Sequence, residues 1–144
     1  MIDSAQSNSG PYVLDTSAAI NLERSNRLRS LPPPGDWIIV PSGVAREKNP
    51  DNPVTPEATK KWLAAGKVAH FTPQEESLYR QLILNPAVDD GEAQAIAMAY
   101  YRNAVLVIDE KRNGEVWRIA QSYGISCVES EEFFDKIKPR LPGF

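Results

Sequence analysis

Short apolar runs alternate with longer amphipathic segments along the chain, which predicts a succession of strands and helices. The apolar runs typical of buried strands lie at residues 12–15, 37–40, 67–71, 104–110 and 125–129. Apolar residues at helical spacing predict helices at residues 16–28, 41–48, 56–66, 72–84, 91–103, 111–124 and 130–139. Strands that are buried on both faces and separated by helices pair in parallel. The pattern therefore predicts a single three-layer α/β/α domain with a mainly parallel central sheet of about five strands.

Polar residues at the predicted helix starts support this assignment. Thr72 followed by Pro73 is typical of an N-cap and a first helical position. Thr16 and Ser17 are the capping candidates for the first helix, and Asp90 is the candidate for the Ala-rich helix.

The length of 144 residues fits one domain, which we expect to span residues 11–144 after a flexible polar lead-in at residues 1–10. The composition, 42% hydrophobic and 24% charged, is that of an ordinary globular protein. No apolar run approaches the roughly 20 residues that a membrane helix needs. The lead-in lacks the basic and apolar regions of a signal peptide, so we expect a cytoplasmic protein without a membrane partner.

The scarcity of histidine and cysteine limits the chemistry that is available. His70 is the single histidine, so a serine-type triad would have to use it, and sites with two histidines are excluded. Cys127 is the single cysteine, which excludes an internal disulfide and a multi-cysteine zinc site. Catalysis would therefore depend mainly on carboxylates, hydroxyls, lysines or arginines.

Acidic residues fall where the predicted strands end or where the following helices begin. In an open α/β sheet, ligands bind at the carboxyl ends of the strands, near a topological switch point. Each acid also has a simpler explanation as a helix cap, a first-turn residue or a solvent-exposed charge. The argument for a site depends on the joint placement of Asp15, Glu47, Asp90, Glu92, Asp109 and Glu110.

Clustered carboxylates need a positive charge to remain ionised together. Mg²⁺ or Mn²⁺ prefers oxygen ligands and supplies that charge, and such ions support phosphodiester hydrolysis. The net charge of −3 argues mildly against a protein that coats nucleic acid. That argument weakens if a metal ion neutralises several acids, because the 16 lysines and arginines then face a polyanion.

The chain resembles the PIN domain family, metal-dependent ribonucleases that include the VapC-type toxins of toxin–antitoxin pairs. The matching motifs are "VLDTSAAINL", "IIVPSGVAREK", "VDDGEAQAIAMAY" and "VLVIDEKRNGEVWRIAQSYGI", in family order between residues 12 and 125. The resemblance implies hydrolysis of RNA at a site holding Mg²⁺ or Mn²⁺. It implies catalytic and metal-binding roles for Asp15, Glu47, Glu92 and Asp109, with Glu110 as an alternative fourth acid.

Further residues near this site have supporting roles in the same interpretation. Thr16 and Ser17 are expected to hydrogen-bond a carboxylate or a water, and Asp90 is an additional acid at the helix start. The expected partners are an RNA substrate, a cognate antitoxin protein and a second copy of the chain in a homodimer. Candidate phosphate contacts are Arg46, Lys48, Lys111, Arg112 and Arg118.

Two other functions are compatible with the same residues. One is a catalytically silent PIN-like scaffold that binds RNA or a protein without cutting. The other is a haloacid-dehalogenase-like phosphatase or a receiver-like domain, in which the first-strand aspartate takes up a phosphoryl group. "LDTS" lacks the second aspartate two residues on that such phosphatases use as acid and base, so this alternative ranks lower.

Overall fold

Four short parallel strands form the centre of the fold, in the order β2-β1-β3-β4. The computed structural model describes residues 11–27, 30–31, 35, 37–41, 68–109 and 114–141. The chain turns to one side of β1 to form β2 and to the other side to form β3, so the carboxyl ends of β1 and β3 make a topological switch point. The strands are β1 (Tyr12–Leu14), β2 (Ile38–Ile39), β3 (Val105–Val107) and β4 (Cys127–Val128).

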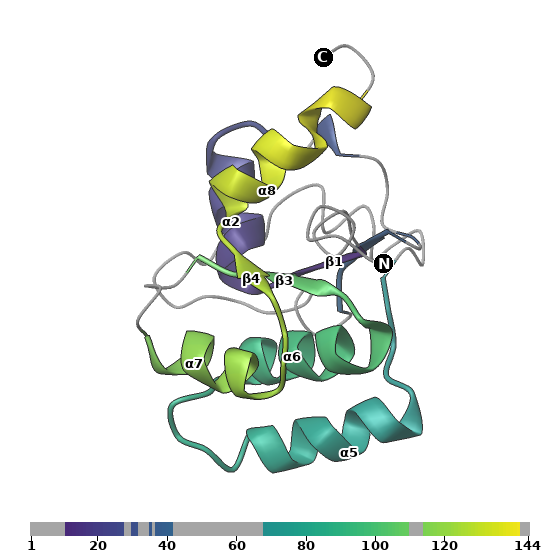
Figure 1. The fold of residues 1–144 in the computed structure, drawn as a ribbon, viewed down its shortest axis with the longest axis vertical. Coiled ribbons are helices and arrows are strands. Elements are labelled where there is room, and N and C mark those ends of the chain that lie inside the picture. The colour runs from purple at the N-terminus through teal and green to yellow at the C-terminus, as the bar shows by residue number, and fades with distance from the viewer. Residues whose placement is uncertain are drawn as a thin grey trace.

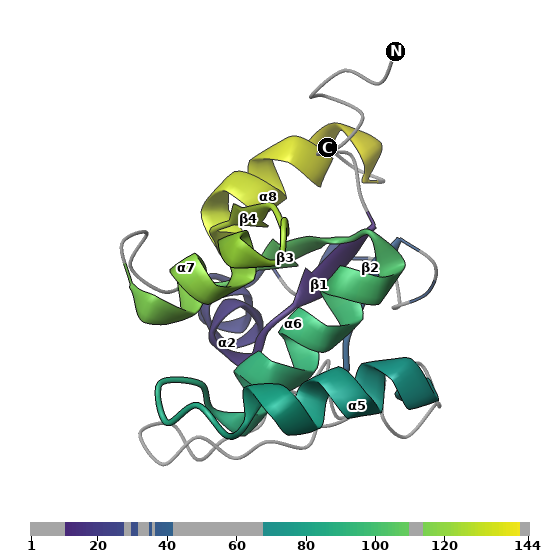
Figure 2. The same cartoon turned by 60° about the horizontal axis from the view of Figure 1, so that its bottom comes forward.

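Helices cover both faces of this sheet, as the sequence predicted (Figure 1). One face carries α2 (Thr16–Arg24) and α8 (Ser130–Ile137), which continues into the 3-10 helix η2 (Lys138–Arg140). The other face carries α6 (Asp90–Arg102) and α7 (Glu115–Ser122). Figure 2 shows α5 (Pro73–Leu82) lying along the outer side of α6. No helix in the described part of the chain has the length and apolar character needed to cross a membrane.

Alternate residues of each strand enter different halves of the core. Tyr12 and Leu14 belong to the cluster under α2 and α8, where the Tyr12 ring meets the Phe133 ring edge-on at 4.9 Å. Val13 and Leu106 point the other way, towards α5, α6 and α7. Because both strand faces are buried, the strands contain almost only apolar residues, which is why their positions could be predicted from the sequence.

The Ala-rich sequence of α6 lets this helix lie close to the sheet. Gly91 and every residue from Ala93 to Ala99 are buried, and α6 contacts both β1 and β3. Small side chains allow a close approach without leaving voids between helix and strands. The helix ends at Asn103, whose φ of 52° is the left-handed conformation that often follows a last turn.

Within the described residues the sheet has four strands, fewer than the five or so that the sequence predicted. Residues 67–71 were expected to form a strand, but the described part of this segment makes a single isolated bridge, Ala69 to Pro41. The Ala69 amide donates to the carbonyl of Val40 at 2.8 Å. Three residues after this bridge, Thr72 caps α5. The predicted helices at 41–48 and 56–66 and the lead-in at 1–10 lie outside the described residues.

A buried ion pair fixes α5 to α6. Glu75, 1% exposed, accepts hydrogen bonds from Arg102 Nε at 2.7 Å and from Arg102 Nη2 at 3.0 Å. Glu75 also accepts from the Thr72 amide, which completes a capping box at the start of α5. Burial alone would raise the pKa of Glu75, but the bonds from Arg102 and Thr72 outweigh it and hold the pKa below its ordinary value.

Replacing Arg102 by methionine should lower the free energy of unfolding by about 3 kcal/mol near neutral pH, since Glu75 would be buried without its partner. A lowered carboxyl pKa stabilises the fold above the unfolded pKa of about 4.3 and stops doing so as the pH falls. The difference in the free energy of unfolding between wild type and Arg102→Met should therefore become smaller at acidic pH. Urea unfolding near pH 7 and near pH 3 measures it.

Arg80→Met is the matched control, because Arg80 forms an exposed pair with Glu76. Exposed pairs of this kind contribute less than about 1 kcal/mol. Equal destabilisation by the two substitutions would contradict a special role for the buried pair.

Candidate active site

Asp15 lies at the switch point, between strand β1 and helix α2. It follows β1 directly and is the N-cap of α2. Its Oδ2 accepts hydrogen bonds from the Ser17 hydroxyl at 2.9 Å and from the Ser17 amide at 3.4 Å. The cap expected at Thr16 or Ser17 therefore lies one residue earlier, since both of these residues are already inside the helix.

Capping accounts for only one of the two carboxylate oxygens. Asp15 is 3% exposed, and within the described residues its Oδ1 is buried without a hydrogen-bond partner. Burial raises the pKa of Asp15 to about 7; the Ser17 hydroxyl acts in the opposite direction, and the negative charge of Asp89 adds to the increase. A buried oxygen without a partner is costly. A residue whose function was only to cap α2 would not need it.

The Ser17 hydroxyl joins the ends of the two central strands. It donates to Asp15 and accepts from the backbone amide of Asp109, at 3.1 Å. The Asp15 amide in turn donates to the carbonyl of Val107 at 3.0 Å. Asp15 and Asp109 are thus held in the same small region at the carboxyl ends of β1 and β3, as the sequence predicted for these strand ends.

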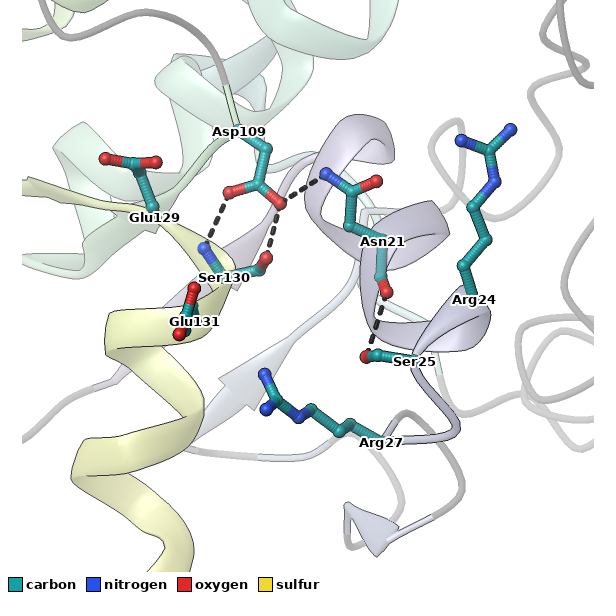
Figure 3. A pocket seen from close by; sticks show the side chains of 8 residues that line it. All are labelled: Asn21, Arg24, Ser25, Arg27, Asp109, Glu129, Ser130 and Glu131. Atoms are coloured by element: carbon teal, nitrogen blue, oxygen red, sulfur yellow. Dashed lines mark hydrogen bonds between the residues drawn. The ribbon is translucent and has the colours of Figure 1, made fainter.

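The carboxylate of Asp109 lies between α2 and α8 (Figure 3). Its Oδ1 accepts from the Ser130 amide at 2.7 Å, and its Oδ2 accepts from the Ser130 hydroxyl and from Asn21 Nδ2, the latter at 2.7 Å. Asp109 therefore fixes the first residue of α8 to the middle of α2.

At the start of α6, the two neighbouring aspartates have different roles. Asp89 is the N-cap, and it forms a capping box in which Glu92 accepts from the Asp89 amide at 2.9 Å. Asp90, which we expected to be the cap, is bonded instead to the Tyr79 hydroxyl and to Gln94 Nε2. The hydrogen bond to Asp90 is the main reason why the pKa of Tyr79 rises to about 12.

The structure therefore brings together some of the predicted site residues. Asp15 and Asp109 are joined through Ser17, while Glu92 is half-buried in the capping box and Asp90 is bonded to α5 and α6 side chains. Arg118 is exposed on α7. Within the described residues, no three acids, histidines or cysteines form a group that could hold a metal ion. The remaining candidates lie outside those residues: Glu47, Glu110, Arg46, Lys48, Lys111 and Arg112.

Three residues that contribute to this region were missed in the sequence. Asp89 has the signature of a capping box, an aspartate followed by a glutamate three positions later, and could have been identified from it. Asn21 lies four residues after Ser17, on the same side of α2. Ser130 follows the last strand, whose carboxyl end meets the same edge of the sheet. The rule that pointed to Asp15 and Asp109 applies equally to Ser130.

The donor chemistry at Asp15 fits a hard divalent cation. Its free Oδ1 is a carboxylate oxygen, the ligand that Mg²⁺ and Mn²⁺ prefer. A nearby positive charge would also reverse the effects of burial and of Asp89, which both disfavour the ionised form of Asp15. In the described part of the chain Asp15 is therefore the residue best prepared to bind such an ion.

Without divalent cations, the raised pKa of Asp15 should make the fold less stable as the pH rises. The unfolded carboxyl has a pKa of about 3.9, so below that value both states are protonated and no penalty exists. Between about 4 and about 7 the unfolded state loses its proton first, which lowers the free energy of unfolding by up to about 4 kcal/mol. Asp15→Asn, which carries no charge at either pH, should lack this part of the decline.

Thermal melts near pH 5 and near pH 8 in the presence of a chelator measure the effect. Asp135→Asn is the control, because Asp135 is exposed on α8. If the melting temperatures of wild type and Asp15→Asn change equally between the two pH values, burial does not destabilise the ionised Asp15 carboxylate.

Comparison with known proteins agrees with this geometry. A sequence-family model described as a PIN domain matches residues 11–129, which include all four strands. No curated protein and no solved structure matches the chain. The match covers well over half of the sequence, and PIN domains have a nuclease-type fold. The chain belongs to the PIN domain family.

Proposed function

We propose that this protein is a ribonuclease that hydrolyses RNA phosphodiester bonds with the help of Mg²⁺ or Mn²⁺. The observation that carries the proposal is the buried, unpartnered Oδ1 of Asp15 at the switch point of the sheet. Membership of a family that is generally made up of nucleases supports the same conclusion. The proposal explains the burial and the raised pKa of the Asp15 carboxyl group by a role in catalysis.

When bound, the cation lowers the pKa of a water molecule and offsets the charge that develops on the phosphodiester. Asp15 would hold it through Oδ1, while the Ser17 hydroxyl, bonded to Oδ2, fixes the orientation of the carboxylate. Glu47 and Glu92 are the further ligands that the family resemblance implies. Of these, Glu92 is placed by its capping bond to Asp89.

Asp109 has a positioning role in this proposal. Both of its oxygens already accept hydrogen bonds from α2 or α8, so its carboxylate is committed to holding these helices. Its amide nevertheless donates to Ser17, which connects it to Asp15. Asp109 would therefore act on the site through Ser17, or contribute a remaining lone pair through a water.

A silent PIN-like scaffold is the second candidate, and the same hydrogen bonds favour it. Asp109 and Glu92, two of the four expected acids, make internal bonds that need no metal. The buried oxygen of Asp15 argues against this candidate, since a scaffold gains nothing from it. The family match argues against a haloacid-dehalogenase-like phosphatase.

The biological setting that we propose follows from the family resemblance. The protein would act in the cytoplasm on an RNA substrate, as a homodimer and as the toxin of a pair whose second member is an antitoxin protein. A neighbouring antitoxin gene would support this setting, and the proposed chemistry does not depend on it.

Asp15→Asn should abolish RNA cleavage and metal binding while leaving the fold intact. We expect calorimetric titration to show Mn²⁺ binding to the wild type and none to the variant, because the carboxylate oxygen that accepts the ion is lost. Cleavage of a mixed single-stranded RNA should fall by at least about a hundredfold. Circular dichroism checks that the secondary structure is retained.

Asp135→Asn removes an exposed carboxylate with the same charge change and should behave like wild type in both assays. Full cleavage by Asp15→Asn would disprove the nuclease proposal as stated. A wild type that neither binds Mn²⁺ nor cleaves RNA would favour the scaffold.

Glu92→Gln separates the two roles of Glu92. Glutamine retains the side-chain oxygen that accepts from the Asp89 amide, so the capping box and the free energy of unfolding should change by less than about 0.5 kcal/mol. If Glu92 is also a metal ligand, cleavage should fall at least about tenfold because the negative charge is lost. Urea unfolding and the RNA cleavage rate together give the answer; unchanged cleavage would reduce Glu92 to a cap.

A further inference from the structure

A groove with a volume of about 650 Å³ lies between α2 and the beginning of α8, beside Asp109 (Figure 3). We refer to it as the α2–α8 groove. Its volume is within the range of small-ligand sites, and it opens at the place where Asp109 joins the two helices. It is lined by Asn21, Arg24, Ser25, Arg27, Asp109, Glu129, Ser130 and Glu131.

The α2 side of the groove carries its positive charge. Arg24 is exposed in the last turn of α2, and Arg27 is half-buried just beyond that helix. The guanidinium of Arg27 lies 5.1 Å from the centre of the Phe134 ring, which orients it. Figure 3 shows Arg27 extending from the α2 side towards α8. In the described part of the chain, neither arginine forms an ion pair.

The α8 side carries carboxylates instead, from Glu129 and Glu131. Neutral hydrogen-bonding side chains, Asn21, Ser25 and Ser130, lie among these charged groups. A ligand that fits both sides has an anionic edge for the arginines and hydrogen-bond donors on its other edge for the glutamates. A nucleotide has this arrangement, with the phosphate on one side and hydroxyl or amino groups on the other.

Arg24 alone has a simpler explanation, because a cation in the last turn complements the helix dipole. That explanation does not extend to Arg27, which lies outside the helix and is held over a ring of α8. Both arginines line the groove, with their guanidinium groups pointing in different directions (Figure 3), and neither forms an ion pair within the described residues; an anionic ligand explains this better.

We infer that the α2–α8 groove binds single-stranded RNA beside the site of cleavage, with phosphates of the strand at Arg24 and at Arg27. The sugars and bases then face Glu129 and Glu131, whose charges keep the phosphates on the α2 side. This inference rests on the proposed ribonuclease function. It names Arg24 and Arg27 as substrate-binding residues that were absent from our sequence-based candidates, and it assigns them no role in the chemical step.

The test is the salt dependence of RNA binding in an Arg24→Gln/Arg27→Gln double variant. Binding of a fluorescently labelled single-stranded RNA of about ten nucleotides is followed by anisotropy, in the Asp15→Asn background so that the RNA is not consumed. Loss of two phosphate contacts should make the slope of log affinity against log salt concentration shallower by about 1.4. Affinity should weaken to a similar extent for RNAs of different sequence.

Two control variants separate charge from structure. Arg24→Lys/Arg27→Lys keeps both positive charges and should retain most of the salt slope. Arg80→Gln removes an exposed arginine on α5 and should leave affinity and slope unchanged. In the otherwise wild-type protein, the glutamine double variant should raise KM for RNA cleavage and leave kcat within about twofold.

The possible outcomes test RNA binding in the groove separately from the proposed function. If the glutamine double variant has the affinity and salt slope of its parent while the wild type cuts RNA, the groove does not bind the substrate, and the ribonuclease proposal is unaffected. A weaker affinity with an unchanged slope would also overturn RNA binding in the groove, because the arginines would then be structural. Failure of the wild type to bind or cut any RNA would overturn the proposed function and the groove with it.

Discussion

The hydroxyl of Ser17 is the contact on which the arrangement of the site depends. It donates to Asp15 and accepts from the amide of Asp109, so one small side chain joins the carboxyl ends of β1 and β3. Asp109 then extends the connection to α8 through Ser130. The chain of hydrogen bonds crosses from the sheet to both helices on one face. The buried core around it holds Asp15 in place although one of its oxygens has no partner.

The elements that could be predicted from the sequence are those whose signal is local. The strand at Val105–Val107 is apolar throughout because both of its faces are buried, and the run is visible without any knowledge of its neighbours. Thr72 followed by Pro73 predicted the beginning of α5, because the cap and the first helical residue are adjacent in the chain. Asp15 and Asp109 were expected at one edge because parallel strands end together.

The features that were missed depend on the direction of a side chain. Asp89 and Asp90 are adjacent acids. The spacing from Asp89 to Glu92 is a capping-box signature in the sequence, but only the three-dimensional structure shows that Asp90 faces Tyr79. The prediction of a fifth strand at residues 67–71 was wrong because strand pairing also depends on the three-dimensional structure. The apolar residues of this segment fit a strand, but Ala69 makes one bridge before Thr72 starts a helix. The pattern of apolar residues in the sequence does not show how many of them form hydrogen bonds with a neighbouring strand.

The charge distribution explains how an acidic protein could hold a polyanion. The net charge is −3, and Asp15, Asp89 and Asp109 place negative charge at the edge of the sheet where the RNA would have to be cut. A phosphate entering this edge is repelled unless a cation is bound there. Arg24 and Arg27 line the α2–α8 groove together with Asp109, so a strand bound there would lie next to one of these acids and hold its phosphates at the arginines. Binding and cutting would therefore use separate positive charges, one set belonging to the protein and the other supplied by a divalent ion. In that proposed division, the arginines would set the affinity for RNA, and an ion at Asp15 would decide whether the bound strand is hydrolysed.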